Sequence, residues 1–128
     1  ELLMLEYSQR LSTRQRNVAA DAAQPQVATA MMLTALRGGA QAVGRPVGGL
    51  AVGQQADFVM LNGADTPLSG LPAIEMLSSH VFASHRTSAI AKVWVAGYAQ
   101  VDSGGRHKLH ASALNGFVTA RRQLLEAP

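Results

Sequence analysis

The four histidines are the residues of this chain best suited to hold a metal ion, and they form two pairs. His107 and His110 bracket Lys108, whose positive charge would repel a bound cation. His80 and His85 are five apart, a spacing that puts them on different faces of either a helix or a strand. Neither pair has an Asp or Glu within a few residues to complete a ligand set, so we interpret the histidines as surface or packing residues.

The possible nucleophiles of the chain do not indicate a catalytic site any more clearly than the histidines indicate a metal site. Ser84-His85, and Ser112 with His110, could be paired as nucleophile and base, but neither pair comes with a strained elbow or an oxyanion hole. The glycine pairs at 38–39 and 48–49 do not match a phosphate-binding fingerprint. The chain has no cysteine, which excludes disulfides and thiolate chemistry. We therefore predict no catalytic, cofactor-binding or metal-ligating residue in this chain.

Among the acidic residues, Asp57 is distinctive because it opens the apolar run from Phe58 to Leu61. A carboxylate at the start of an apolar strand needs backbone N–H partners or water. We expect a structural role, in which Asp57 ties the preceding glycine-rich loop to the strand. Gly49 and Gly53 in that loop, and Gly97 at a later turn, are expected to be structural as well.

Composition excludes several classes of protein. With 128 residues, 48% hydrophobic and 15% charged, the chain is typical of a globular domain. No apolar run approaches the roughly 20 residues of a membrane-spanning helix, so no membrane partner is expected. The net charge of +3 comes with arginines that lack interleaved aromatics, so we expect no nucleic-acid partner. The start carries no secretory signal pattern, and together with the missing cysteines this favours a cytoplasmic protein.

The first third of the sequence predicts two helices. Residues 2–16 place Leu3, Tyr7 and Leu11 along one face at intervals of four, with Glu6 on another face. A second helix is predicted over 25–43, with Pro25 in its first turn, where the missing N–H costs nothing.

The pair Gly38-Gly39 interrupts the apolar pattern of the second helix. A glycine inside a helix costs about 1 kcal/mol relative to alanine. We therefore expect these glycines to mark a break, a helix end or the close approach of another backbone.

The rest of the chain alternates between strands and helices. Residues 56–62 are predicted to form a strand buried on both faces, followed by a loop at 63–72 and one or two helical turns at 74–77. A second strand at 90–96 leads through a tight turn at Gly97-Tyr98 into a short strand at 99–101 and a turn at 102–105. A last helix is expected at 112–126, and one of its sides carries Leu114, Phe117, Val118, Arg121, Leu124 and Leu125.

Two motifs resemble the amidohydrolase superfamily of metal-dependent hydrolases: Gly49-Leu50-x-x-Gly53-x-x-Ala56-Asp57-Phe58-Val59 and Val93-Trp94-Val95-Ala96-Gly97. In that superfamily such segments lead from the barrel into a small β-sandwich. The resemblance implies an α/β chain that is the C-terminal fragment of a (β/α)8-barrel enzyme. Residues 1–46 would be helices from the end of the barrel, 47–106 strands of the small β-sandwich, and 107–128 a closing helix.

Further segments resemble the N-formimino-L-glutamate deiminases of histidine degradation: Leu3 to Leu11, Arg16-Asn17 and Gly38 to Arg45. The resemblance implies hydrolysis of a formimino C=N bond, with release of ammonia, by an enzyme that typically uses zinc. Zinc lowers the pKa of its bound water to near neutrality. The residues of that chemistry are expected upstream of residue 1, so none is carried onto this chain, and the fragment alone is expected to be inactive.

Two alternatives remain open. The parent enzyme of the same superfamily could act on another small molecule, such as a purine, a cytosine-like base or imidazolonepropionate. The chain could instead be a free-standing, non-catalytic module that acts by association. In an intact barrel the apolar stripes of the first two helices would cover strands encoded upstream. Without those strands the stripes need another partner, so we expect a homo-oligomer, most simply a dimer joined through these helices.

Overall fold

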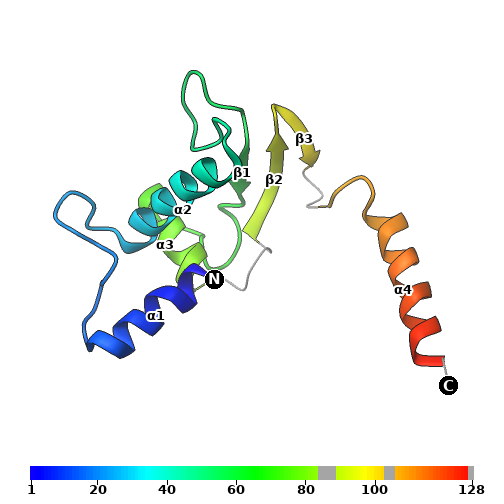
Figure 1. The fold of residues 1–128 in the computed structure, drawn as a ribbon, viewed down its shortest axis with the longest axis horizontal. Helices are drawn as coiled ribbons and strands as arrows, with labels where there is room; N and C mark the ends of the chain where they lie inside the picture. Colours follow the sequence, from blue (N-terminus) through cyan, green and yellow to red (C-terminus); the bar gives the residue numbers. More distant parts are fainter. Residues whose placement is uncertain (84–88, 103–105, 127–128) are drawn as a thin grey trace.

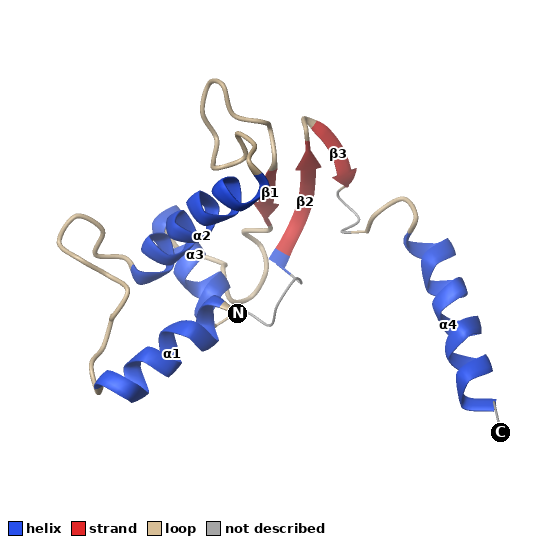
Figure 2. Cartoon of the chain, viewed as in Figure 1, coloured by secondary structure: helices blue, strands red, loops and turns tan. Residues whose placement is uncertain are grey.

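The computed structural model describes residues 1–83, 89–102 and 106–126 (Figure 1). The described part is mixed α/β, with four helices and one three-stranded sheet (Figure 2). The elements follow in the order α1 (Leu2–Thr13), α2 (Val27–Val43), β1 (Phe58–Leu61), α3 (Ala73–Phe82), β2 (Ile90–Val95), β3 (Tyr98–Val101) and α4 (His110–Glu126). This order of helices and strands is the one that the sequence predicts. None of the described helices is long and apolar enough to cross a membrane.

Helices α1, α2 and α3 pack against one another beside the sheet (Figure 1). The small hydrophobic core is built mainly from the start of α2 and from two positions in connecting segments. Its buried members are Val27, Ala28, Met31, Leu68 and Ala89. The core is small for a chain of this length, because many large apolar side chains outside it remain exposed.

The first helix is shorter than predicted and buries a different face. It ends at Thr13 instead of residue 16, because Arg14 adopts a left-handed conformation with φ of 53°. On the expected apolar stripe, Leu11 is 82% exposed, whereas the buried residue of the helix is Glu6. The expectation that the helix packs through the stripe of Leu3, Tyr7 and Leu11 is therefore wrong at Leu11, and the face that carries Glu6 is buried instead.

The second helix starts at Val27, so Pro25 precedes it, and it runs through Gly38-Gly39 to Val43. The expectation of a break at these glycines is wrong. A β-carbon at either glycine would meet no atom within 4 Å, so no neighbouring backbone approaches closely there. The helix ends one turn later at Gly44, whose φ is 64° and whose N–H donates to the carbonyls of Ala40 and Gln41.

The sheet is antiparallel in the order β1-β2-β3, with Phe58 opposite Trp94 and Val59 opposite Val93. The expectation that the first strand is buried on both faces is wrong, since Val59 and Met60 are 54% and 43% exposed. The reason is that β1 lies at the edge of the sheet and, among the described residues, no helix packs closely over it.

The β2–β3 hairpin turns at Ala96-Gly97, one residue earlier than predicted. Both residues have positive φ, 52° and 79°, as a two-residue type I′ hairpin requires. The third helix is also longer than the one or two turns expected, running from Ala73 to Phe82. Most of the turn predicted at 102–105 lies outside the described residues.

Candidate functional site

The Asp57 carboxylate joins the loop before β1 to the β2–β3 hairpin. Its Oδ1 accepts a hydrogen bond of 2.6 Å from the backbone N–H of Ala96. Both of its oxygens accept from the side-chain amide of Gln55, at 2.9 and 2.8 Å. Next to it, the N–H of Gly97 donates to the carbonyl of Ala56 at 2.9 Å. The backbone donor that Asp57 satisfies thus comes from the hairpin turn, and only the side-chain donor comes from the preceding loop.

These contacts keep the Asp57 carboxyl ionised. The hydrogen bond from Gln55 and then that from the Ala96 N–H lower the pKa of Asp57. Burial opposes them by less than either hydrogen bond, and the charge of Arg45 adds a still smaller lowering. The Arg45 guanidinium itself donates to the side-chain oxygen of Gln55, so the three side chains form a chain of contacts. A carboxylate engaged in this way holds backbone segments together and is poorly placed to act as a base.

The glycines predicted to be structural lie at bends of the backbone. Gly53 and Gly97 have φ of 87° and 79°, values that residues with a β-carbon rarely adopt. Gly49 lies in the same loop as Gly53, ahead of Asp57, with φ of 151°. The structure brings Gly97 next to Asp57 through the Ala56–Gly97 hydrogen bond, and it leaves Gly49 and Gly53 in the loop between α2 and β1.

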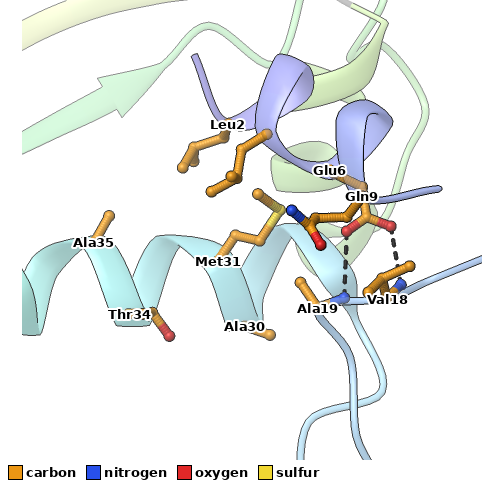
Figure 3. Close-up of a pocket in the computed structure, with 10 residues that line it drawn as sticks. Leu2, Glu6, Gln9, Val18, Ala19, Ala30, Met31, Thr34 and Ala35 are labelled. Atoms are coloured by element: carbon orange, nitrogen blue, oxygen red, sulfur yellow. Dashed lines mark hydrogen bonds between the residues drawn. The ribbon is translucent and has the colours of Figure 1, made fainter. Parts of the chain in front are cut away.

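A cavity of about 320 Å³ lies between α1, α2 and the segment that joins them (Figure 3). Its walls are mostly apolar, and they are formed by Leu2, Leu5, Glu6, Gln9, Val18, Ala19, Ala30, Met31, Thr34 and Ala35. The carboxylate of Glu6 points at the connecting segment, where it accepts from the N–H groups of Val18 at 3.1 Å and Ala19 at 3.2 Å (Figure 3).

Glu6 also accepts a 2.7 Å hydrogen bond from Nε of Arg10, one helical turn away. Burial raises the pKa of the Glu6 carboxyl, but the hydrogen bonds from Arg10, Ala19 and Val18 and the charge of Arg10 together lower it below its ordinary value. The guanidinium of Arg10 in turn lies over the rings of Tyr7 and Phe82, 5.4 and 5.7 Å from their centroids. Glu6 and Arg10 therefore tie α1 to the segment after it and to α3.

Sequence reasoning missed Glu6 because a single glutamate on a helix is usually solvated. One signal was available: Glu6 and Arg10 are four apart, the spacing of a helical ion pair. That spacing predicts the pair but not its burial, which depends on Val18 and Ala19 folding back over the helix.

The histidines do not form a metal site in the described residues. His107 uses both ring nitrogens: Nδ1 accepts from the N–H of Leu109 at 3.1 Å, and Nε2 lies 3.3 Å from Oε1 of Gln100. Across residues 1–83, 89–102 and 106–126, no group of three or more His, Cys, Asp or Glu side chains is placed to hold an ion. His85 and Ser84, one of the two nucleophile–base pairs weighed above, lie outside the described residues.

Taken together, Asp57 and Glu6 are carboxylates whose oxygens are already engaged by backbone and side-chain donors. The cavity beside Glu6 offers apolar walls, with Gln9 and Thr34 as its other polar side chains. This arrangement can hold segments in place and accept an apolar group. It supplies no nucleophile paired with a base among the residues that line it.

The sequence and the fold of the chain were compared with those of known proteins. No protein-family model matches the sequence. A formimidoylglutamate deiminase of Pseudomonas aeruginosa is 38% identical over 126 residues, which are 98% of this chain and 27% of that protein. The crystal structure of an amidohydrolase from Brucella melitensis matches with 40% identity and a TM-score of 0.82, again over 98% of this chain and 27% of the other. The chain thus spans about a quarter of the length of the relatives it matches. The resemblance predicted from its motifs is confirmed: the chain is similar to the C-terminal part of a formimidoylglutamate deiminase and to a solved amidohydrolase.

Proposed function

We propose that this chain is the C-terminal part of a metal-dependent amidohydrolase that deaminates N-formimino-L-glutamate. The observation that supports the proposal most directly is the 38% identity to a formimidoylglutamate deiminase along nearly the whole chain. The 40% identity and TM-score of 0.82 to a solved amidohydrolase support the same class of enzyme.

The proposed reaction is hydrolysis of a formimino group. Water adds to the carbon of the C=N bond, the bond from that carbon to the terminal nitrogen breaks, and ammonia leaves with N-formylglutamate as the other product. Zinc is the metal we propose for the whole enzyme; when bound, such a metal supplies an activated water.

The described residues do not fit a zinc site, because they include no cluster of three potential ligands. We therefore assign no step of the reaction to them. The ligands and the catalytic groups are proposed to lie in the parts of the enzyme that correspond to the unmatched 73% of the relatives, the remainder after the 27% that is covered.

The contribution of this chain would be structural. Residues 1–46 would supply helices at the end of the barrel, 47–106 part of the small β-sandwich and 107–128 the closing helix. The Asp57–Ala96 contact would fix the loop that enters the sandwich, and Glu6 would fix the segment that leaves α1. We further propose that the whole enzyme is cytoplasmic and homo-oligomeric and that its substrate is a small molecule.

The test begins with the DNA immediately upstream of the codon for Glu1. We expect an open reading frame in phase with this chain that encodes the remainder of an amidohydrolase. The protein made from the joined frame should release ammonia from N-formimino-L-glutamate with a higher kcat/KM than from guanine, adenine, cytosine or imidazolonepropionate.

Two results would contradict the proposal. A higher kcat/KM for a purine, cytosine or imidazolonepropionate would keep the class of enzyme and overturn the substrate. A natural start of translation at residue 1, with no barrel encoded ahead of it, would favour the non-catalytic association module.

A further inference from the structure

Among the described residues, helix α4 has no substantial packing contact with another helix or strand. In the described residues, the packing between elements joins α1, α2 and α3 to one another and the three strands to one another, and α4 has no substantial share in it. Figure 1 shows α4 running away from both the helices and the sheet.

One side of α4 is nevertheless apolar. On a helix with 3.6 residues per turn, the side chains of this face fall within an arc of about 120°, the width of a stripe that normally faces a core. Within it, Phe117 is 59% and Leu124 is 78% exposed, and the guanidinium of Arg121 lies 5.3 Å from the centroid of the Phe117 ring. We call this face the α4 stripe; it consists of Leu114, Phe117, Val118, Arg121, Leu124 and Leu125.

An uncovered stripe of this kind calls for a partner. A helix of 17 residues gains most of its stability in a protein from packing its apolar face, since isolated helices near this length are marginal in water. Exposed contiguous apolar surface is correspondingly rare on soluble proteins and marks an interaction site.

The comparisons indicate which partner. The solved amidohydrolase that matches this chain is about 3.6 times as long, because the match covers 98% of this chain and 27% of the amidohydrolase. The match extends over 98% of this chain, so the relative includes a counterpart of nearly all of it, α4 included, within a much larger polypeptide. We infer that the α4 stripe docks on the part of the amidohydrolase polypeptide that lies outside this chain, and that α4 clamps the C-terminal part onto the rest of the enzyme. This inference rests on the proposed function only in taking the whole protein to be an amidohydrolase.

The experiment uses a chimera in which the matching C-terminal 27% of the Pseudomonas formimidoylglutamate deiminase is replaced by this chain. Trypsin reports on α4, because the helix contains Arg121 and Arg122. We compare the rates of cleavage after these two arginines, identified by mass spectrometry, in the chimera and in the 128-residue chain alone. Docking should slow cleavage in the chimera by at least about tenfold, because a protease cuts the transiently opened segment.

A pair of matched variants separates docking from helix formation. Phe117→Asp places a charge on the stripe and should restore fast cleavage in the chimera. Asn115→Asp adds the same charge two residues away, on nearly the opposite side of the helix and off the stripe, and should leave the chimera protected. The new carboxylate of Phe117→Asp lies four residues before Arg121, a spacing at which an ion pair supports a helix and offsets the lost contact between Arg121 and the Phe117 ring.

Every other outcome overturns the inference. Equal cleavage of the chimera and the isolated chain, or equal effects of the two variants, would show that α4 does not dock on the remainder. Protection of α4 in the isolated chain that rises with its concentration would assign the stripe to a second copy instead. If the chimera is insoluble while the Pseudomonas enzyme is soluble, this chain cannot replace the C-terminal part of that enzyme, and α4 does not form the inferred contact with the remainder. The proposed substrate is tested separately, by the release of ammonia from N-formimino-L-glutamate. If that assay is negative, the expected pattern of trypsin cleavage is unchanged.

Discussion

The carboxylate of Asp57 and the backbone N–H of Ala96 are 2.6 Å apart although 39 residues separate them in the sequence. This hydrogen bond, with the Gly97–Ala56 hydrogen bond beside it, fastens the turn of the β2–β3 hairpin to the residues that lead into β1. The edge strand β1 therefore has two sources of register: its ladder with β2 and this contact at its start.

Replacing Asp57 with Ala should lower the midpoint of thermal unfolding, because the N–H of Ala96 and the amide of Gln55 lose their acceptor. Asp57→Asn should lower it less, since it keeps an acceptor oxygen of similar shape. Circular dichroism melts of the three proteins measure this order. A midpoint unchanged by Asp57→Ala would reject the structural role of the carboxylate.

Glu6 should make the stability of the chain dependent on pH. Its pKa is lowered in the folded state, so the stabilisation is fully present above the unfolded value, about 4.5, and is lost as the pH falls through the folded value. Glu6→Gln should be less stable than the original chain at pH 7 by about 1–3 kcal/mol, the cost of a lost charged acceptor. The difference should shrink as the pH falls below 4.5 and vanish only well below the lowered pKa of the folded state.

Urea unfolding of both proteins at pH 7 and at pH 3 measures these differences. Gln9→Glu serves as the matched variant, because Gln9 lines the same cavity from the same helix. A constant difference between the original chain and Glu6→Gln at the two pH values would show that Glu6 acts through its shape and not its charge.

The order of the elements could be predicted from local patterns, but burial could not. Alternation and helical spacing located α1, α2, the strands and α4, because these signals depend on neighbours in sequence. Glu6 is buried because Val18 and Ala19 fold over it. Val59 is exposed because, among the described residues, no helix packs closely over the edge strand β1. Neither result follows from the spacing of residues in the sequence. The motif containing Asp57 predicted a contact at the loop–strand junction, while its donor in the distant hairpin required the structure.

Gly38 and Gly39 lie inside α2 although glycine has a low helix propensity. The helix continues through both, and a β-carbon at either would meet no atom within 4 Å. Gly38→Ala and Gly39→Ala should therefore each stabilise the isolated chain, by up to about 1 kcal/mol, through the higher helix propensity of alanine. Urea unfolding tests this. Destabilisation by either substitution would show that another backbone does approach α2 there, as the sequence alone suggested.

The 128-residue chain alone should bind no stoichiometric zinc and release no ammonia from N-formimino-L-glutamate. The described residues contain no cluster of three potential ligands, and the relatives that carry the name of a deiminase or an amidohydrolase are about 3.6 times as long as this chain. Metal analysis of protein purified without a metal-affinity tag, together with an ammonia assay, checks both statements. Stoichiometric zinc with turnover would contradict the assignment of the catalytic groups to the unmatched part of the enzyme.

The isolated chain should associate with itself through its N-terminal helices. Leu11 on α1 is 82% exposed, and Leu5 and Leu33 are also exposed on α1 and α2. Burying such side chains is favourable by about 25 cal/mol per Å² before the costs of association are subtracted. Light scattering over a dilution series should show a dimer that dissociates on dilution.

Two substitutions locate the contact. Leu11→Glu should shift the equilibrium to monomer at every concentration, because it places a charge on the exposed face of α1. Phe117→Asp should leave the dimer unchanged, because α4 is assigned to the remainder of the enzyme and not to a second copy. A monomer at all concentrations would mean that α1 and α2 need no partner beyond the packing seen in this chain, and a dimer lost only with Phe117→Asp would move the contact from α1 to α4.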